Sequence, residues 1–272
     1  RIKPPFPAVS GLYNCPTAVN NVETLCNVPS IMTNGAEWFA SLGPEKNGGP
    51  KLYCVSGHVK RPGVYEASMK TTLKELIFDR AGGIRDGRTL KAVIPGGSSV
   101  PILLPDQLDV PASFDDVAKA GSLLGSAGII VMDDTTCMVW AAQNLLHFYK
   151  HESCGKCTPC REGGDWLHRI LGKIERGEGE MRDLDLLLSI SNNILGKTLC
   201  AFGDAAATPV LSTIKQFRAE YEAHIREGRC TVPAPWRSGA KAMAVVAKAR
   251  AAVKRRRLFM GITPLVVVED RN

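Results

Sequence analysis

The sequence lacks the features of several common classes of protein. No apolar run approaches the roughly 18–20 residues of a membrane helix, and the opening RIKPPFPAVSGLYNCP has no apolar signal-peptide core. There is no G-x-G-x-x-G motif, and the GKT at Gly196–Thr198 has Ser191 where a P-loop requires glycine. We therefore expect neither a membrane span nor a Rossmann or P-loop nucleotide site.

Basic character is also missing from most of the chain. The formal net charge is +7 over 272 residues, but residues 231–272 hold nine Lys or Arg and two acidic residues. The excess of positive charge thus belongs to this tail, and the rest of the chain is balanced. We expect no nucleic-acid partner.

Cysteine is present nine times, in a chain without an export signal. This pattern favours a reducing compartment over a disulfide framework. Cysteines in that setting are metal ligands or buried small hydrophobes. Five of them stand alone in the sequence, and we interpret them as structural thiols: Cys15, Cys26, Cys54, Cys137 and Cys230.

The first half of the chain changes pattern at PEKNGGP, residues 44–50, which we interpret as a linker. Before it, a short helix is expected from about Asn21 to Val28, and residues 31–42 also show helical spacing. After it, residues 51–104 predict a small α+β module. Its expected strands are KLYCVSG, VYEAS, LKAVIPGG and VPILL, with a helix at TTLKELIFDRAGG; GIIVMDD at 128–134 is a further strand-like run.

The pattern becomes helical from Thr135. Four helices joined by short loops predict a bundle, and the overall fold class is α+β. The first helix has an apolar face that includes Val139, Leu146 and Phe148. The four segments are CMVWAAQNLLHFYKHES, GGDWLHRILGKIERGEG, MRDLDLLLSISNNIL and AAATPVLSTIKQFRAEYEAHIREG.

Cys154, Cys157 and Cys160 recur every third residue in a Gly/Pro-containing loop, ESCGKCTPCREGG. Inert buried thiols would not need that spacing. A zinc site completed by His151 or His168 is one interpretation, and an iron–sulfur cluster is another. A redox C-x-x-C pair would leave the third cysteine unexplained.

The spacing favours the cluster. A loop with two-residue gaps can hold three corners of a cubane but cannot reach the fourth, so a remote cysteine is needed. Cys200, after the third predicted helix, is placed where a loop could return. Zinc sites more often show paired C-x-x-C units. Lys156 and Arg161 flank the triplet and would favour an anionic cluster, although they could equally be solvated surface charges.

Three separate segments resemble the NADH-binding flavoprotein (51 kDa or F) subunit of respiratory complex I and the related diaphorase subunits of NAD-linked hydrogenases and formate dehydrogenases. They are SCGKCTPCREG with TLCAFGDAA forty residues on, KPPFPAVSGLYNCPTAVNNVETLCNVP, and SGHVKRPGVYE with AGGIRDGR and KAVIPGGSS. The resemblance covers about residues 1–230.

The resemblance implies electron transfer from the substrate NADH through FMN to a [4Fe-4S] cluster. No catalytic side chain is expected, because hydride transfer is the chemistry of the flavin. The implied cluster ligands are Cys154, Cys157, Cys160 and Cys200. The residues implied to touch FMN are Asn20, Asn21 and Thr24; taken by themselves, these three predict only a helix cap.

The same resemblance implies four parts of the chain. These are the end of an FMN/NADH-binding domain (1–50), a β-grasp soluble-ligand-binding module (51–108), a helical [4Fe-4S] domain (135–230) and a basic tail (231–272) that is non-conserved, disordered or in contact with anionic lipid or an acidic neighbour. The family's glycine-rich FMN/NADH loop lies upstream of anything present here. We therefore expect the C-terminal part of a longer or split flavoprotein that does not bind FMN tightly unaided.

The expected partners are other hydrophilic-arm subunits of complex I, especially the thioredoxin-like [2Fe-2S] subunit and the large iron–sulfur subunit. Membrane association is expected only through the complex, on the cytoplasmic face of a bacterial inner membrane. Two alternatives remain open. One is a diaphorase subunit with another acceptor, and the other is a zinc-stabilised, non-enzymatic scaffold.

Overall fold

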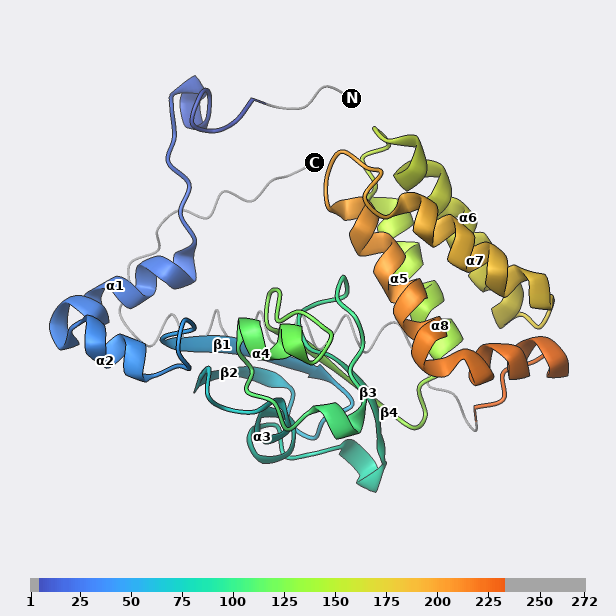
Figure 1. Ribbon diagram of the computed structural model, residues 1–272, viewed down its shortest axis with the longest axis horizontal. Coiled ribbons are helices and arrows are strands. Elements are labelled where there is room, and N and C mark those ends of the chain that lie inside the picture. Colours follow the sequence, from blue (N-terminus) through green and yellow to red (C-terminus); the bar gives the residue numbers. More distant parts are fainter. Residues whose placement is uncertain (1–4, 233–272) are drawn as a thin grey trace.

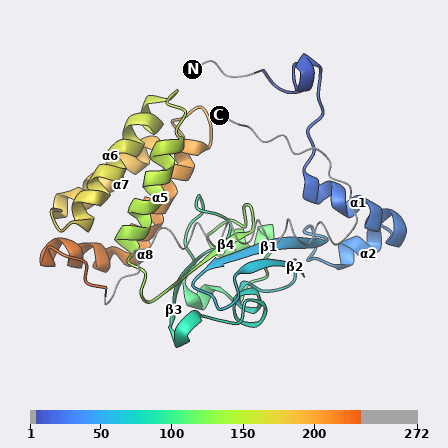
Figure 2. The ribbon, with the colours of Figure 1, turned by 180° about the vertical axis from the view of Figure 1, so that it is seen from behind.

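The computed structural model describes residues 5–232 (Figure 1). The expectation for the basic tail falls almost entirely on residues 233–272, outside the described residues. The described chain is α+β, as predicted, with a small four-stranded sheet and a group of long helices. In both views the long helices stand at one end of the sheet, and the N-terminal helices lie at the other (Figure 1, Figure 2).

The N-terminal segment forms helices α1 (Val22–Asn34) and α2 (Ala36–Ser41). The expected helix is present but runs past Pro29, which lies inside α1 instead of near its end. The break comes at Gly35, which has a φ of 90°. That conformation is accessible mainly to glycine, so glycine, not proline, sets the helix boundary here.

The sheet contains β1 (Pro50–Gly57), β2 (Gly63–Ser68), β3 (Leu90–Ile94) and β4 (Gly128–Asp133) in the order β2-β1-β4-β3. β1 pairs antiparallel with β2 and parallel with β4. β4 lies in the sequence beyond residue 108, where the module was expected to end. Because β1 and β4 are parallel, a long crossover must connect them. The sheet is therefore completed only by this later strand.

One expected strand is missing from the described sheet. The segment VPILL makes only an isolated bridge between Val93 and Leu103. Pro101 lies within this segment and Pro105 follows it, and proline has no N–H to donate to a strand ladder. The expected helix at 71–83 is short: α3 (Leu73–Glu75) starts at a Thr72–Glu75 capping box and continues as one π-helical turn, Leu76–Arg80.

The four predicted helices are present as α5 (Met138–Glu152), α6 (Thr158–Glu175), α7 (Met181–Ile194) and α8 (Phe202–Glu227), and they pack around a shared core. Val139 and Leu146 are buried in it, but Phe148 is 51% exposed. Phe148 follows Leu146 by two residues, about 200° around the helix, so it points away from the core. The short helix α4 (Phe114–Lys119) precedes β4.

The bundle is tied to the sheet mainly through β3 and the loop after it. Lys91 Nζ lies 2.7 Å from Glu220 Oε2, and the Ile102 amide donates to Ser212 Oγ at 2.7 Å. Tyr149 and Ser98 share a hydroxyl hydrogen bond of 2.8 Å. α8 kinks at Phe217, and its last turns bend away from the bundle axis (Figure 1).

Two neighbouring leucines of α7 provide a test of the bundle core. Leu187 is fully buried and Leu186 is 46% exposed. We expect Leu187→Ala to lower the free energy of unfolding by about 2–5 kcal/mol, because it leaves a cavity. Leu186→Ala should change it by about 0.5 kcal/mol or less. Urea unfolding followed by circular dichroism measures both, and equal losses would contradict this packing.

Candidate metal centre

The structure brings all four predicted cysteines to one cavity. Cys154 lies in the loop between α5 and α6, Cys157 is the N-cap of α6, Cys160 is in its first turn, and Cys200 lies in the loop between α7 and α8. A cavity of about 160 Å³ is lined by all four. The triplet is thus not wholly in a loop, because Pro159 stands in the first turn of α6, a position that proline favours.

Local hydrogen bonds hold the triplet side of the cavity. Gly155 has a φ of 76°, and its amide donates to Ser153 Oγ at 3.3 Å. The same hydroxyl lies 3.3 Å from Cys160 Sγ. Arg161 Nη1 donates to the Gly155 carbonyl at 2.7 Å. Arg161 therefore helps to shape the loop and is not only a solvated charge.

The Cys200 side is held in a similar way. The Leu199 amide donates to Cys157 Sγ at 3.3 Å, which joins the two loops directly. Thr198 Oγ1 donates to the Cys200 carbonyl at 2.8 Å. Gly203, at the start of α8, has no room for a side chain, because a Cβ there would lie 2.5 Å from Thr198 Oγ1.

The four thiols also affect one another electrostatically. Burial raises the pKa of Cys160, the Ser153 hydroxyl opposes this, and negative charge on Cys200, Cys154 and Cys157 would raise it further. Four thiolates in this space would repel one another unless cations separated them. Thiolates are the ligands of iron–sulfur clusters and of many zinc sites, so the donor set fits either metal group.

Neither histidine considered for a zinc site lines this cavity. The side chain of His151 is 81% exposed and lies 3.0 Å from Glu152 Oε1. The ring of His168 packs against that of His147, with centroids 5.5 Å apart. The described residues around the cavity therefore offer four thiols and no imidazole, a donor set that fits a [4Fe-4S] cluster and excludes the Cys–His zinc site considered from the sequence.

The three residues expected to touch FMN lie far along the chain from this cavity, at the start of α1. Asn21 is the N-cap, and its Oδ1 accepts from the Thr24 amide at 2.9 Å. Asn20, Asn21 and Thr24 are not buried. Their geometry is that of a helix cap whose outer side faces solvent.

The structure also gathers residues that sequence reasoning kept apart. Cys137, His224 and Cys230 place their ligand atoms within 4.8 Å of one another. Two of these residues, Cys137 and Cys230, had been interpreted from the sequence as isolated structural thiols. The other three cysteines interpreted in this way are exposed: Cys15, Cys26 and Cys54. The spacing His224-x5-Cys230 was the available signal, and it needed a distant third residue to be informative.

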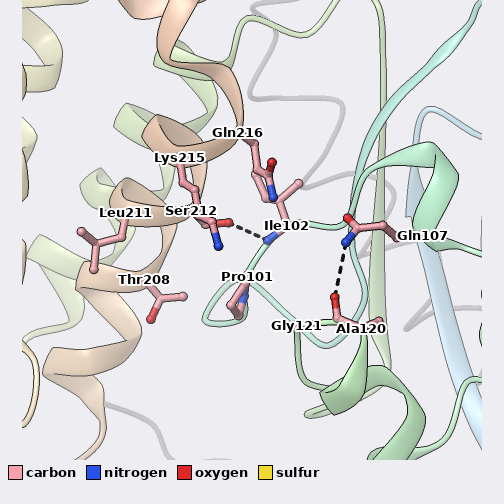
Figure 3. Close-up of a pocket in the computed structure, with 10 residues that line it drawn as sticks. All are labelled: Pro101, Ile102, Gln107, Ala120, Gly121, Thr208, Leu211, Ser212, Lys215 and Gln216. Atoms are coloured by element: carbon pink, nitrogen blue, oxygen red, sulfur yellow. Dashed lines mark hydrogen bonds between the residues drawn. The ribbon is translucent and has the colours of Figure 1, made fainter.

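A second cavity, of about 280 Å³, lies between the sheet module and α8 (Figure 3). Gln107 and Ala120 line one side, while Thr208, Ser212 and Lys215 line the other. Its lining includes no cysteine, histidine or carboxylate. This cavity lies at the interface between the sheet module and the helical bundle, and its lining residues offer no set of metal ligands.

Comparison with known families agrees with the cysteine geometry. Residues 140–224 match the family described as the NADH-ubiquinone oxidoreductase-F iron-sulfur binding region. Residues 51–131 match the SLBB domain. The first match contains all four cysteines of the cavity, and it supports a [4Fe-4S] cluster in this part of the chain.

Several curated proteins have sequences similar to that of this chain. The F subunit of the NADH-quinone oxidoreductase of Mycobacterium tuberculosis is 56% identical over 230 residues, which are 85% of this chain and 52% of the relative. A second F subunit, from the NADH-quinone oxidoreductase of Rhizobium meliloti, is 54% identical, with 85% and 55% covered. This chain resembles the F subunits, so the resemblance predicted from its motifs is confirmed. It spans about half the length of these relatives, which fits a resemblance to their C-terminal portion.

A solved structure of similar fold is that of an NAD+-reducing [NiFe]-hydrogenase in the air-oxidised state. It is 34% identical, with a TM-score of 0.72, and the match covers 92% of this chain and 42% of that one. The F-subunit resemblance therefore extends to a hydrogenase component. Within residues 5–232, no helix has both the length and the apolar character required to cross a bilayer.

Two helical glycines test the close approach beside Cys200. Gly203→Ala is expected to destabilise the chain by about 1–3 kcal/mol through overpacking against Thr198. Gly164→Ala meets no atom within 4 Å and should be neutral or stabilising by up to about 1 kcal/mol, since alanine favours helices. Urea unfolding compares the two variants. A stabilised Gly203→Ala variant would show that the loop does not approach α8 as described.

Proposed function

We propose that Cys154, Cys157, Cys160 and Cys200 hold a [4Fe-4S] cluster that carries electrons from NADH and FMN toward quinone in an F-subunit-type NADH:quinone oxidoreductase. The observation that supports this most strongly is the meeting of four thiols at one cavity, within the region that matches the iron–sulfur family. When bound, such a cluster accepts and releases single electrons.

The contribution of this chain is to hold the four sulfurs and to set their surroundings. The Leu199 amide donates to Cys157 Sγ, and the Ser153 hydroxyl lies 3.3 Å from Cys160 Sγ, where it would donate to a ligand thiolate. Such bonds stabilise negative charge on sulfur and raise the reduction potential of a cluster. Lys156 lines the cavity, and its charge would act in the same direction.

The flavin side of the reaction would lie mostly outside this chain. We assign Asn20, Asn21 and Thr24 to its edge, because their amide and hydroxyl groups lie unburied at the start of α1. Many apolar side chains of the same segment are exposed, including Tyr13 at 88% and Met32 at 80%. Such a surface suits contact with the remaining half of an F subunit, the FMN/NADH-binding part.

The proposed division of the chain follows from these roles. Residues 1–50 complete the FMN/NADH-binding domain, and residues 135–230 form the helical cluster domain. The β-grasp module of the SLBB type starts at residue 51, and we extend it from 108 to 133, because β4 belongs to its sheet and the SLBB match reaches into that strand. The expected partners are other subunits of the hydrophilic arm, including the thioredoxin-like [2Fe-2S] subunit and the large iron–sulfur subunit, on the cytoplasmic face of the membrane.

A second candidate function is that of a diaphorase subunit in an NAD-linked hydrogenase. The fold match to an NAD+-reducing [NiFe]-hydrogenase favours it. The higher identity to quinone oxidoreductase subunits, 56% against 34%, favours quinone as the final acceptor. Both functions use the same cluster, so they differ in partners and not in the chemistry of these four cysteines.

The cluster can be tested by measuring iron, acid-labile sulfide and zinc in the full chain after anaerobic purification. We expect about four iron and four sulfide per chain, and Cys200→Ser should lose the intact cluster. Cys26→Ser, an exposed cysteine outside the cavity, is the matched control and should keep it. Zinc at the four cysteines, without sulfide, would contradict the electron-transfer function and support a zinc-stabilised, non-enzymatic scaffold.

Ser153→Ala tests the influence of the hydroxyl on the cluster. Loss of one hydrogen bond worth about 0.5–1.5 kcal/mol should lower the reduction potential by about 20–60 mV, because a one-electron couple changes by 59 mV per tenfold. Ser189→Ala, far along the chain on α7, is the control. A redox titration followed by electron paramagnetic resonance measures the shift, and an unchanged potential would show that Ser153 does not donate to the ligand sulfur.

A further inference from the structure

The end of the bundle remote from the four-cysteine cavity holds a second cluster of metal-ligating side chains. Cys137 is the N-cap of α5, His224 lies near the end of α8, and Cys230 follows α8. The four-cysteine cavity lies beyond the other end of α5, which is 15 residues long, or about 22 Å. These three residues therefore cannot serve the same metal group as Cys154 or Cys200.

The donor atoms are spaced like the ligands of one ion. Cys137 Sγ lies 3.3 Å from His224 Nε2. Glu175 Oε2, at the end of α6, lies 3.7 Å from each of these two atoms. Ligands of a tetrahedral zinc site, with bonds of about 2.0–2.3 Å, are separated by about 3.3–3.8 Å. The sulfur of Cys230 is within 4.8 Å of the Cys137 sulfur and the His224 ring nitrogen, and Glu175 is outside this group of three. Binding of one ion by all four residues would therefore require Cys230 and Glu175 to move closer together.

The imidazole has a partner on its other nitrogen. His224 Nδ1 lies 2.9 Å from the backbone carbonyl oxygen of Glu220. A carbonyl can only accept, so Nδ1 carries a proton, and in the neutral imidazole the lone pair is then on Nε2, the nitrogen nearest Cys137. Zinc-binding histidines commonly show this arrangement, in which the second nitrogen donates to a carbonyl or carboxylate.

Two glycine turns bring the last ligand into place. Gly177 follows α6 and Gly228 follows α8, with φ values of 78° and 62°. A Cβ on Gly177 would lie 1.8 Å from the Gly228 carbonyl oxygen. The two turns touch through their backbones, and this contact returns the chain after α8 toward Glu175, where Cys230 lies beside the bundle core.

We propose that Cys137, His224 and Cys230, with Glu175 as the fourth ligand, form a structural site for a zinc ion. Two thiolates, an imidazole and a carboxylate are ligands that zinc takes, and four protein ligands make a closed, structural site instead of a catalytic one. Cys137 and His224 are fully buried, so solvent has little access. The ion would join the start of α5 to the ends of α6 and α8; Cys137 and His224 alone are 87 residues apart in the sequence.

The site is independent of the cluster proposed above, and metal analysis can separate the two. The full chain, purified anaerobically from zinc-supplied cells, is expected to hold one zinc per chain in addition to its iron. Cys230→Ser, at a partly exposed position, should fold and lose at least nine-tenths of this zinc while it keeps its iron. Cys200→Ser should show the reverse pattern, and Cys54→Ser, at an exposed cysteine, should keep both metals.

X-ray absorption at the zinc edge tests the ligand set in the unaltered chain, without any variant that might misfold. Two sulfurs at about 2.3 Å and two nitrogen or oxygen neighbours at about 2.0–2.1 Å are expected. Four sulfur neighbours would place the zinc at the four-cysteine cavity and overturn the proposal. So would a folded chain that holds no zinc, zinc retained in Cys230→Ser, or a Cys137–Cys230 disulfide found by mass spectrometry.

Discussion

The packing of α5 against α6 and α8 is the constraint on which the rest of this structure depends. It places the C-terminal end of α5 and the N-terminal ends of α6 and α8 at one end of the bundle. Cys157 and Cys160, on α6, then lie beside the loop that carries Cys200. Without this common core, thiols forty residues apart would have no reason to share a cavity, because nothing local in the sequence holds the two loops together.

The same packing creates a second meeting point at the opposite end. There the start of α5 and the ends of α6 and α8 converge, and they bring Cys137, Glu175 and His224 together. The bundle therefore separates two groups of residues that could bind metals. One end is partly open, with Cys154 and Cys200 exposed, while Cys137 and His224 at the other end are fully buried. An electron carrier needs access for its partners and a structural ion does not, so the difference in exposure agrees with the two proposed roles.

Local pattern was a sound guide wherever one short segment decided the outcome. The apolar periodicity predicted the four bundle helices, and the turn-rich segment at 44–50 marked the start of the sheet module. Two errors came from misreading that local pattern. Phe148 was expected on the apolar face with Leu146, yet it is exposed, because the two residues lie about 200° apart around the helix. The strand at VPILL was lost because its prolines cannot support a ladder.

The sequence by itself determined the chemistry that is available: three thiols at a strict spacing, one remote thiol, and glycines where the backbone must turn sharply. Resemblance to the F subunit then gave those thiols a function. Only the tertiary structure decided which distant residues meet. The spacing of His224 and Cys230 alone was not informative, since a ligand set that also includes Cys137 joins distant parts of the chain. It exists only after the helices have buried their apolar faces against one another, which is the step that sets the distances between their ends.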